Sequence, residues 1–259
     1  MPHSFSLSLA AVDILLEHLS LGRAPQPFDV PHLGTTFEQR AQIRDAVFRD
    51  LEARGVVSRG RLDPDAELAL RTLVTAPVAI MAVAQLDEGD RPLFARTASD
   101  GQYALVARQD QNLMVFEDVR PTALVASIVD LLPLTPAAAG QSVTIAKPAP
   151  KQGRHRNDEG GYDPFRGVAK PRSAAPSQVR VVERIFAKSK LRIGQFTVYR
   201  PGRDGKPHPG SPTAWFDTEE GRYFVTSRNA EDGQSWLTYS PADNARIARH
   251  LFEQLQGQR

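Results

Sequence analysis

The sequence predicts an α/β (α+β) protein: a central, largely antiparallel sheet with flanking helices and an internal pseudo-twofold duplication. Three observations support this: a pattern that occurs twice, strand-like alternation around two glycine turns, and a helix-period run after a proline in each copy. Six residues recur at a single offset of 120 positions: Pro92, Gly101, Tyr103, Arg108, Pro121 and Leu131 return as Pro212, Gly221, Tyr223, Arg228, Pro241 and Leu251.

Each copy begins with two strands joined by a tight turn that needs a positive φ at glycine. In the first copy the strands are residues 92–98 and 102–108, and in the second they are 212–218 and 222–228. A third short strand follows, with Phe116 or Trp236, and then a proline that suits the first turn of a helix. The repeated unit is therefore a β-meander closed by a helix.

A further apolar strand precedes each copy, at residues 77–86 and 194–200. A meander of this size cannot bury its apolar face alone, so we expect the two units to share one core.

The chain before the first copy predicts a short strand and three helices. Residues 5–9 alternate, and a helical stripe follows that ends at Gly22. A second helix begins with a capping box at Thr35 and Glu38 and ends at Gly55, a suitable left-handed C-cap. The pair Asp63-Pro64 then starts a third helix.

Amino-acid composition divides the chain into three segments, and we expect the two outer segments to form one domain. Residues 1–135 are the N-terminal half and 177–259 the C-terminal half, which opens with a short helix over 179–186. Between them, residues 136–176 are a basic linker rich in proline and glycine, for which we expect poor order apart from a short strand at 142–145.

Composition excludes several classes. The chain has no cysteine, so disulfides and cysteine-bound metals are excluded. The first residues do not resemble a secretory signal, and no apolar run approaches the ~20 residues that a membrane span needs. The expected location is the cytoplasm.

The search for chemistry finds no catalytic, cofactor or metal motif. The six histidines show no zinc spacing, and the sequence lacks a nucleophile elbow, a Walker loop and a dinucleotide-binding fingerprint. Asp87, Glu88 and Asp90 crowd a hairpin tip that could bind calcium weakly but is more often a solvated turn. We therefore expect a protein that is not an enzyme and uses no cofactor.

Positive charge gathers in the middle of the chain, and this supports an alternative function. Residues 147–206 hold 15 Lys and Arg against 5 Asp and Glu. Five of these basic residues have near-helical spacing and could follow a phosphate backbone: Arg180, Arg184, Lys188, Lys190 and Arg192. The alternative is thus a basic regulatory or nucleic-acid-binding adaptor, although a solvated basic face explains the same pattern.

Several stretches resemble the EspG family of the ESX (type VII) secretion systems of actinobacteria. They include Ala53-Arg54-Gly55-Val56-Val57, Leu62-Asp63-Pro64 and the strand after Pro77. Leu93-Phe94-Ala95-Arg96 and the strand and helix over 236–255 are similar too. The likeness covers nearly the whole chain except 148–176.

The resemblance implies a cytosolic chaperone that binds a helical secreted client of the PE–PPE type and keeps it soluble for export. Family members hold the client with a loop between two strands, an exposed sheet face and C-terminal helices. Carried over, the loop falls at residues 86–91, and the helices at 179–188 and 242–255.

The candidate contact residues are Asp87, Glu88, Gly89, Asp90, Phe196, Val198, Trp215 and Trp236. For the aromatic members the alternative is core packing, and exposure separates the two. The loop is short and acidic here, which indicates a different client from that of the mycobacterial members. A face that binds clients could also pair with itself, so a homodimer is a further expectation.

Overall fold

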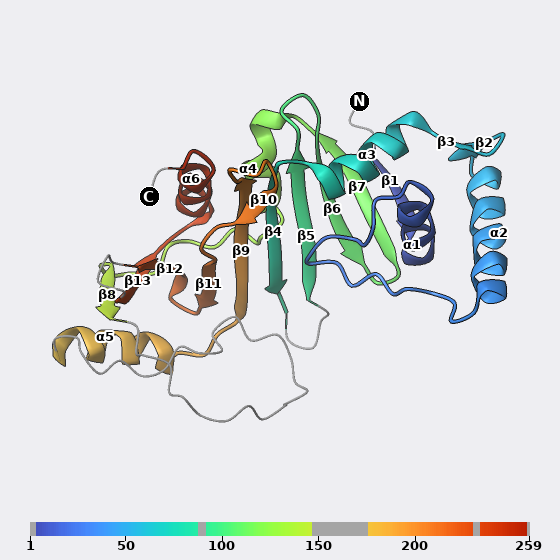
Figure 1. Cartoon of the computed structure of the whole chain (residues 1–259). Helices are drawn as coiled ribbons and strands as arrows, with labels where there is room; N and C mark the ends of the chain where they lie inside the picture. The colour runs from blue at the N-terminus through green and yellow to red at the C-terminus, as the bar shows by residue number, and fades with distance from the viewer. Residues whose placement is uncertain (1–3, 88–91, 147–175, 230–233, 258–259) are drawn as a thin grey trace. The chain divides into compact units, whose positions relative to one another are not determined.

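The computed structural model describes residues 4–87, 92–146, 176–229 and 234–257 (Figure 1). The described residues form six α-helices: α1 (Leu9–His18), α2 (Phe37–Ala53), α3 (Pro64–Thr75), α4 (Leu124–Val129), α5 (Pro176–Ala187) and α6 (Asn244–Leu255). A short 3-10 helix, η1 (Pro121–Ala123), leads into α4.

The strands before residue 147 are β1 (Ser4–Ser8), β2 (Val57–Ser58), β3 (Arg61–Leu62), β4 (Val78–Gln85), β5 (Leu93–Ser99), β6 (Ala104–Asp110), β7 (Leu113–Val119) and β8 (Val143–Ala146). The later strands are β9 (Arg192–Pro201), β10 (Pro207–Pro209), β11 (Thr213–Thr218), β12 (Gly221–Asn229) and β13 (Ser235–Pro241).

A large antiparallel sheet is the centre of the fold, as the sequence predicts. Within the described residues it has eleven strands in the order β1-β7-β6-β5-β4-β9-β11-β12-β13-β8, with β10 added to β9. Strands β2 and β3 form a separate small hairpin. Both predicted meanders are present, as β4-β5-β6-β7 followed by α4 and as β9-β11-β12-β13 followed by α6.

The chain divides into two compact units. The first contains residues 1–83, 93–131 and 198–209, and the second contains 84–92, 132–197 and 210–259. The exchange of residues 84–92 and 198–209 between the units was not predicted, because it depends on which strands become neighbours.

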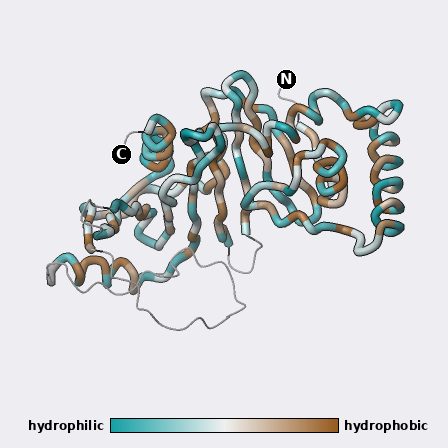
Figure 2. Tube along the Cα trace, in the orientation of Figure 1, coloured by the Kyte–Doolittle hydropathy of each residue, from teal (hydrophilic) through white to brown (hydrophobic). Residues whose placement is uncertain are grey.

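In the first unit, α1 and α3 cover one face of the strands. Alternate residues of β1, β6 and β7 point to that face, because partners in an antiparallel register share a side. They form a core with the helices: Leu7, Ile14, Leu15, Leu70, Leu105, Ala107, Met114 and Phe116. Figure 2 shows that α1 is mostly hydrophobic and α2 mostly hydrophilic, in keeping with their burial.

In the second unit, α5 and α6 lie on opposite sides of the strands. The α5 side is a core of aromatic and branched residues: Ile145, Val182, Ile185, Phe216, Tyr223, Val225, Leu237 and Tyr239. On the other side, His250 of α6 packs on the Phe224 ring at 5.4 Å between centroids. Tyr223 and Phe224 are consecutive in β12, so they point to opposite faces.

The predicted turns are confirmed. Gly101 has φ +96° and Gly221 φ +120°, and both stand at the hairpin tips where the sequence requires positive φ. Gly55 ends α2 with φ +73°. The side chain of Asp63 caps α3 by accepting from the N–H groups of Asp65 and Ala66.

Three local predictions need correction. The N-cap of α2 is Thr36, which accepts from the Gln39 N–H, and Gln39 reaches back to Thr35, so the capping box lies one residue later than predicted. Helix α1 ends at His18 rather than near Gly22, because Ser20 already has a positive φ. The strand in the predicted linker extends over Val143–Ala146; residues 147–175 of that linker lie outside the described residues.

Candidate partner-binding surface

Exposure separates the predicted contact residues into two groups. Phe196, Val198 and Trp215 are at most 1% exposed, so these side chains pack inside the protein. Trp236 is 37% exposed. Among the predicted aromatic positions, Trp236 is therefore the one whose side chain is available to a partner in this state.

Trp215 is buried because its neighbours leave room for an indole ring on both sides. Gly194 is its partner in the β9–β11 register, and a Cβ atom placed on Gly194 would lie 2.7 Å from the ring. The guanidinium carbon of Arg222 lies 4.6 Å from the ring centroid, a cation–π distance. Because Gly194 has no side chain, the indole fits against the strand.

Arg222 is the centre of a buried polar network in the second unit. Its Nε and Nη2 donate to the two carboxylate oxygens of Asp217, at 2.6 and 2.9 Å. Nη1 donates to the side chain of Asn244, the first residue of α6, and Nη2 also donates to the Pro133 carbonyl at 3.1 Å. Arg222 and Asp217 are fully buried. Their bidentate pairing replaces the hydration that each charge loses on burial. The network thus ties α6 to the sheet.

Helix α6 has one buried stripe and one large apolar residue that is exposed. Asp243 caps its N-terminus, and Ile247 and Leu251 are fully buried against the sheet. Phe252 is 54% exposed. Burial, opposed in part by Glu253, lowers the pKa of His250, so its imidazole stays neutral at neutral pH.

The sheet face beside α6 carries Trp236 among polar residues. The register pairs Trp236 with Arg228 on β12 and with Ala146 on β8, and pairs Thr238 with Thr226 and Thr144. These residues share the side of Phe224, on which α6 lies. We call Trp236, Arg228, Thr226, Thr238 and Thr144 the Trp236 face. It combines one large aromatic and one arginine with short side chains, and Trp and Arg are the residues most enriched at binding hot spots.

Of the four candidate contact residues in the predicted loop, the structure describes one. Asp87 is exposed at the end of β4, and its carbonyl accepts from the Gln85 side chain at 2.7 Å. Glu88, Gly89 and Asp90 lie outside the described residues.

The five basic residues with near-helical spacing, which we call the basic stripe, differ in whether they contact other groups of the protein. Lys188 pairs with Glu220, and Lys190 donates to the carbonyls of Phe186 and Lys188 at the end of α5. Arg192 donates to the Leu86 carbonyl and lies 3.6 Å from Asp217. Arg180 and Arg184 are exposed. Three of the five cations therefore have structural roles, which weakens the nucleic-acid interpretation.

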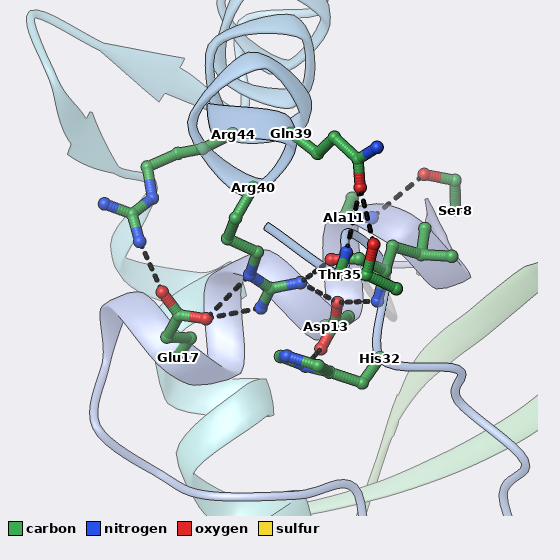
Figure 3. A network of polar contacts seen from close by, with 10 residues as sticks. Ser8, Ala11, Asp13, Glu17, His32, Thr35, Gln39, Arg40 and Arg44 are labelled. Carbon is green, nitrogen blue, oxygen red and sulfur yellow. Dashed lines mark hydrogen bonds and ion pairs between the residues drawn. The ribbon is translucent and has the colours of Figure 1, made fainter. Parts of the chain in front are cut away.

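A second polar cluster joins α1 and α2 in the first unit (Figure 3). Arg40, almost buried, donates to Asp13 and Glu17 of α1, and Arg44 also donates to Glu17. Asp13 further accepts from the Leu33 N–H at 3.0 Å. Burial alone would raise the pKa of Asp13, but these hydrogen bonds outweigh it and hold the pKa below its ordinary value. The donors and acceptors satisfy one another, so the cluster fastens two helices.

Within the described ranges, no group of three or more His, Asp and Glu side chains is arranged to hold a metal ion. Across the same ranges, no helix has the length and apolarity to cross a membrane.

Comparison with known proteins gives a match to a family and matches to solved structures. The model of the EspG family matches residues 8–253 of this chain. Among solved structures, the chain is similar to the type VII secretion system chaperone EspG5 of Mycobacterium tuberculosis, determined in complex with the PE25–PPE41 dimer. That match has a TM-score of 0.66 and 14% sequence identity, and covers 98% of this chain and 97% of that chain. A search of curated proteins found no match.

Proposed function

This chain belongs to the EspG family, and on that basis we propose that it is a cytosolic chaperone of an actinobacterial type VII secretion system. It binds a helical secreted client of the PE–PPE type and keeps that client soluble until export. The family match across nearly the whole chain carries the proposal. The likeness to EspG5 over almost the full length of both chains supports it, since EspG5 was determined with a PE–PPE dimer.

We propose that the Trp236 face and the exposed side of α6 form the client-binding surface. Trp236 and Phe252 offer apolar area, and Arg228 offers a charged donor beside the indole. The threonines are short enough to let a partner approach the strands closely. Such a surface shields an apolar patch of a folded client and needs no catalytic group. We also propose Asp87, which is exposed after β4, as a polar contact residue.

The experiment is a pull-down from the native host with the purified chain as bait, followed by mass spectrometry. We expect one small helical secreted protein or pair at near one-to-one stoichiometry. Trp236→Ala should weaken the affinity for that client about tenfold or more, as removal of a hot-spot aromatic does. Leu113→Ala is the matched control, because Leu113 is similarly exposed at 44% but lies in the first unit.

Recovery of nucleic acid or ribosomal proteins in place of such a client would contradict the chaperone function. Equal loss of client binding in the Leu113 and Trp236 variants would leave the function standing and contradict the assigned surface.

A further inference from the structure

Strand β1 lies at one end of the sheet order and pairs with β7 on one side. The N–H of Leu9 donates to the Asn112 carbonyl across the continuation of this pair, at 2.8 Å. In an antiparallel ladder, inward and outward backbone groups alternate along the strand. Leu7 and Phe5 therefore direct their N–H and C=O groups to β7, and Ser4, Ser6 and Ser8 direct theirs to the outer edge.

One arginine reaches the middle of that outer edge. Arg54, at the C-terminal end of α2, donates through Nη2 to the Ser6 carbonyl at 2.6 Å. Its own position is fixed by the helix, since its N–H donates to the Asp50 carbonyl and its guanidinium lies 3.5 Å from the Asp50 carboxylate. At its other end α2 is fastened to α1 by Arg40 (Figure 3). Proteins commonly prevent strand addition by placing charged side chains at an edge strand or by covering it with a helix or loop.

The strand that would fit this edge is a second copy of β1. The sequence Ser-Phe-Ser-Leu-Ser is self-complementary when two copies run antiparallel about Ser6. Ser4 then faces the second Ser8 on one side of the sheet, and Phe5 faces the second Leu7 on the other, so polar residues meet polar residues and apolar residues meet apolar residues. No charge within Ser4–Ser8 opposes the pairing.

We propose that the outer edge of β1 is a self-association site, and that Arg54 keeps it closed to the β1 strand of a second copy. The arginine occupies the Ser6 carbonyl, which is the central acceptor of the antiparallel pair. Removal of the guanidinium frees this acceptor and opens the edge to a continuous sheet through two copies.

The experiment compares the self-association of full-length Arg54→Ala, of the parent and of Arg49→Ala by sedimentation velocity over a range of concentrations. Arg49 is an exposed arginine earlier on the same helix and serves as the matched control. We expect Arg54→Ala to lower the dimer dissociation constant about tenfold or more, because one charge-assisted hydrogen bond no longer competes. The parent and Arg49→Ala should remain monomeric at concentrations where Arg54→Ala dimerises.

Two further variants show which strand is responsible. Ser6→Pro in the Arg54→Ala background removes the outward N–H without removing a bond to β7, so it should restore the monomer. Because the chain has no cysteine, Ser6→Cys gives one defined site for a short bismaleimide crosslinker. The crosslinked dimer should form with Arg54→Ala and not with Arg54 in place.

Circular dichroism and thermal unfolding verify that each variant is folded. A folded Arg54→Ala protein that stays as monomeric as Arg49→Ala would overturn the proposal, and so would a dimer that persists with Ser6→Pro.

Discussion

At the residue scale, the contact between Gly194 and Trp215 sets a tight packing constraint in the second unit. The two residues face each other across β9 and β11, and a Cβ on Gly194 would also lie 2.8 Å from the Cβ of Ala84. We predict that Gly194→Ala lowers the free energy of unfolding by about 1–3 kcal/mol, since overpacking a filled core has this cost. Urea denaturation followed by tryptophan fluorescence measures the change.

The Trp215→Leu substitution tests whether overpacking against the indole ring causes the loss of stability in Gly194→Ala. If the indole is the obstacle, Gly194→Ala should cost less in the Trp215→Leu background than in the parent, because residues in contact are not additive. Strict additivity of the two changes would show that the loss comes from elsewhere.

The carboxylate of Asp13 makes stability depend on pH. Its pKa in the folded protein lies below the ordinary value of 3.8, so its contribution is complete above about pH 4 and is lost as the pH falls through the lowered pKa. We predict that Asp13→Asn costs about 1–3 kcal/mol at pH 7, because Arg40 loses a charged acceptor. The difference from the parent should shrink below about pH 4.

Urea midpoints between pH 3 and 7 test this prediction, with Asp45→Asn as the control for an exposed carboxylate on α2. A penalty for Asp13→Asn that stays constant across this range would contradict an ionic role.

At the element scale, helix α6 should loosen as the pH falls. Burial against Phe224 lowers the pKa of His250 below 6.5, so the unfolded chain takes up a proton before the folded protein does. The contribution of His250 to the free energy of unfolding is therefore complete above about pH 6.5, and it declines as the pH falls toward the lowered pKa. We predict that hydrogen exchange of α6 amides accelerates between pH 7 and 5.5, after correction for the intrinsic rate.

His250→Gln keeps a polar group beside Gln254, which lies 3.2 Å from the imidazole, and should remove most of this pH effect. His208→Gln, at an exposed histidine, is the control. An unchanged pH effect in His250→Gln would assign the loosening to another group.

Elements were predictable where a local signal defines them. The acidic pair before Gly221 and the serine and aspartate before Gly101 indicate tight turns, and both hairpins are present. The fate of Trp215 was not predictable, because it depends on a glycine that is a neighbour only after the strands align. The pair Asp217 and Arg222 was missed, although both flank the predicted turn and face each other in its register.

No local sequence signal predicted the polar contacts between residues that are far apart in the chain. Arg40 meets carboxylates 23 and 27 positions earlier, on a helix whose direction the sequence does not specify. Among the candidate site residues, the exposed tryptophan was not identifiable, since alternation places Trp215 and Trp236 on the same kind of strand position. The space that Gly194 leaves for the ring and the guanidinium of Arg222 stacked on it account for the burial of Trp215.

At the scale of the whole molecule, the response of client binding to salt separates the two functions that the composition allows. A protein that binds a phosphate backbone releases counterions, so its affinity falls steeply with salt, by about 10³ or more between 50 and 200 mM for six contacts. Lys188, Lys190 and Arg192 are engaged within the protein, and only Arg180 and Arg184 of that stripe are exposed. We predict that client affinity changes less than about tenfold over this range, because apolar burial at Trp236 is not screened.

Isothermal titration with the purified client at several salt concentrations measures this dependence. Arg180→Ala with Arg184→Ala is the matched variant, since it removes the exposed charges of α5 and leaves the Trp236 face intact. The chaperone function predicts nearly parental client affinity in that double variant and a negative heat-capacity change on binding, the mark of apolar burial. A steep salt slope that the double variant flattens would transfer the binding site to α5 and favour the basic adaptor.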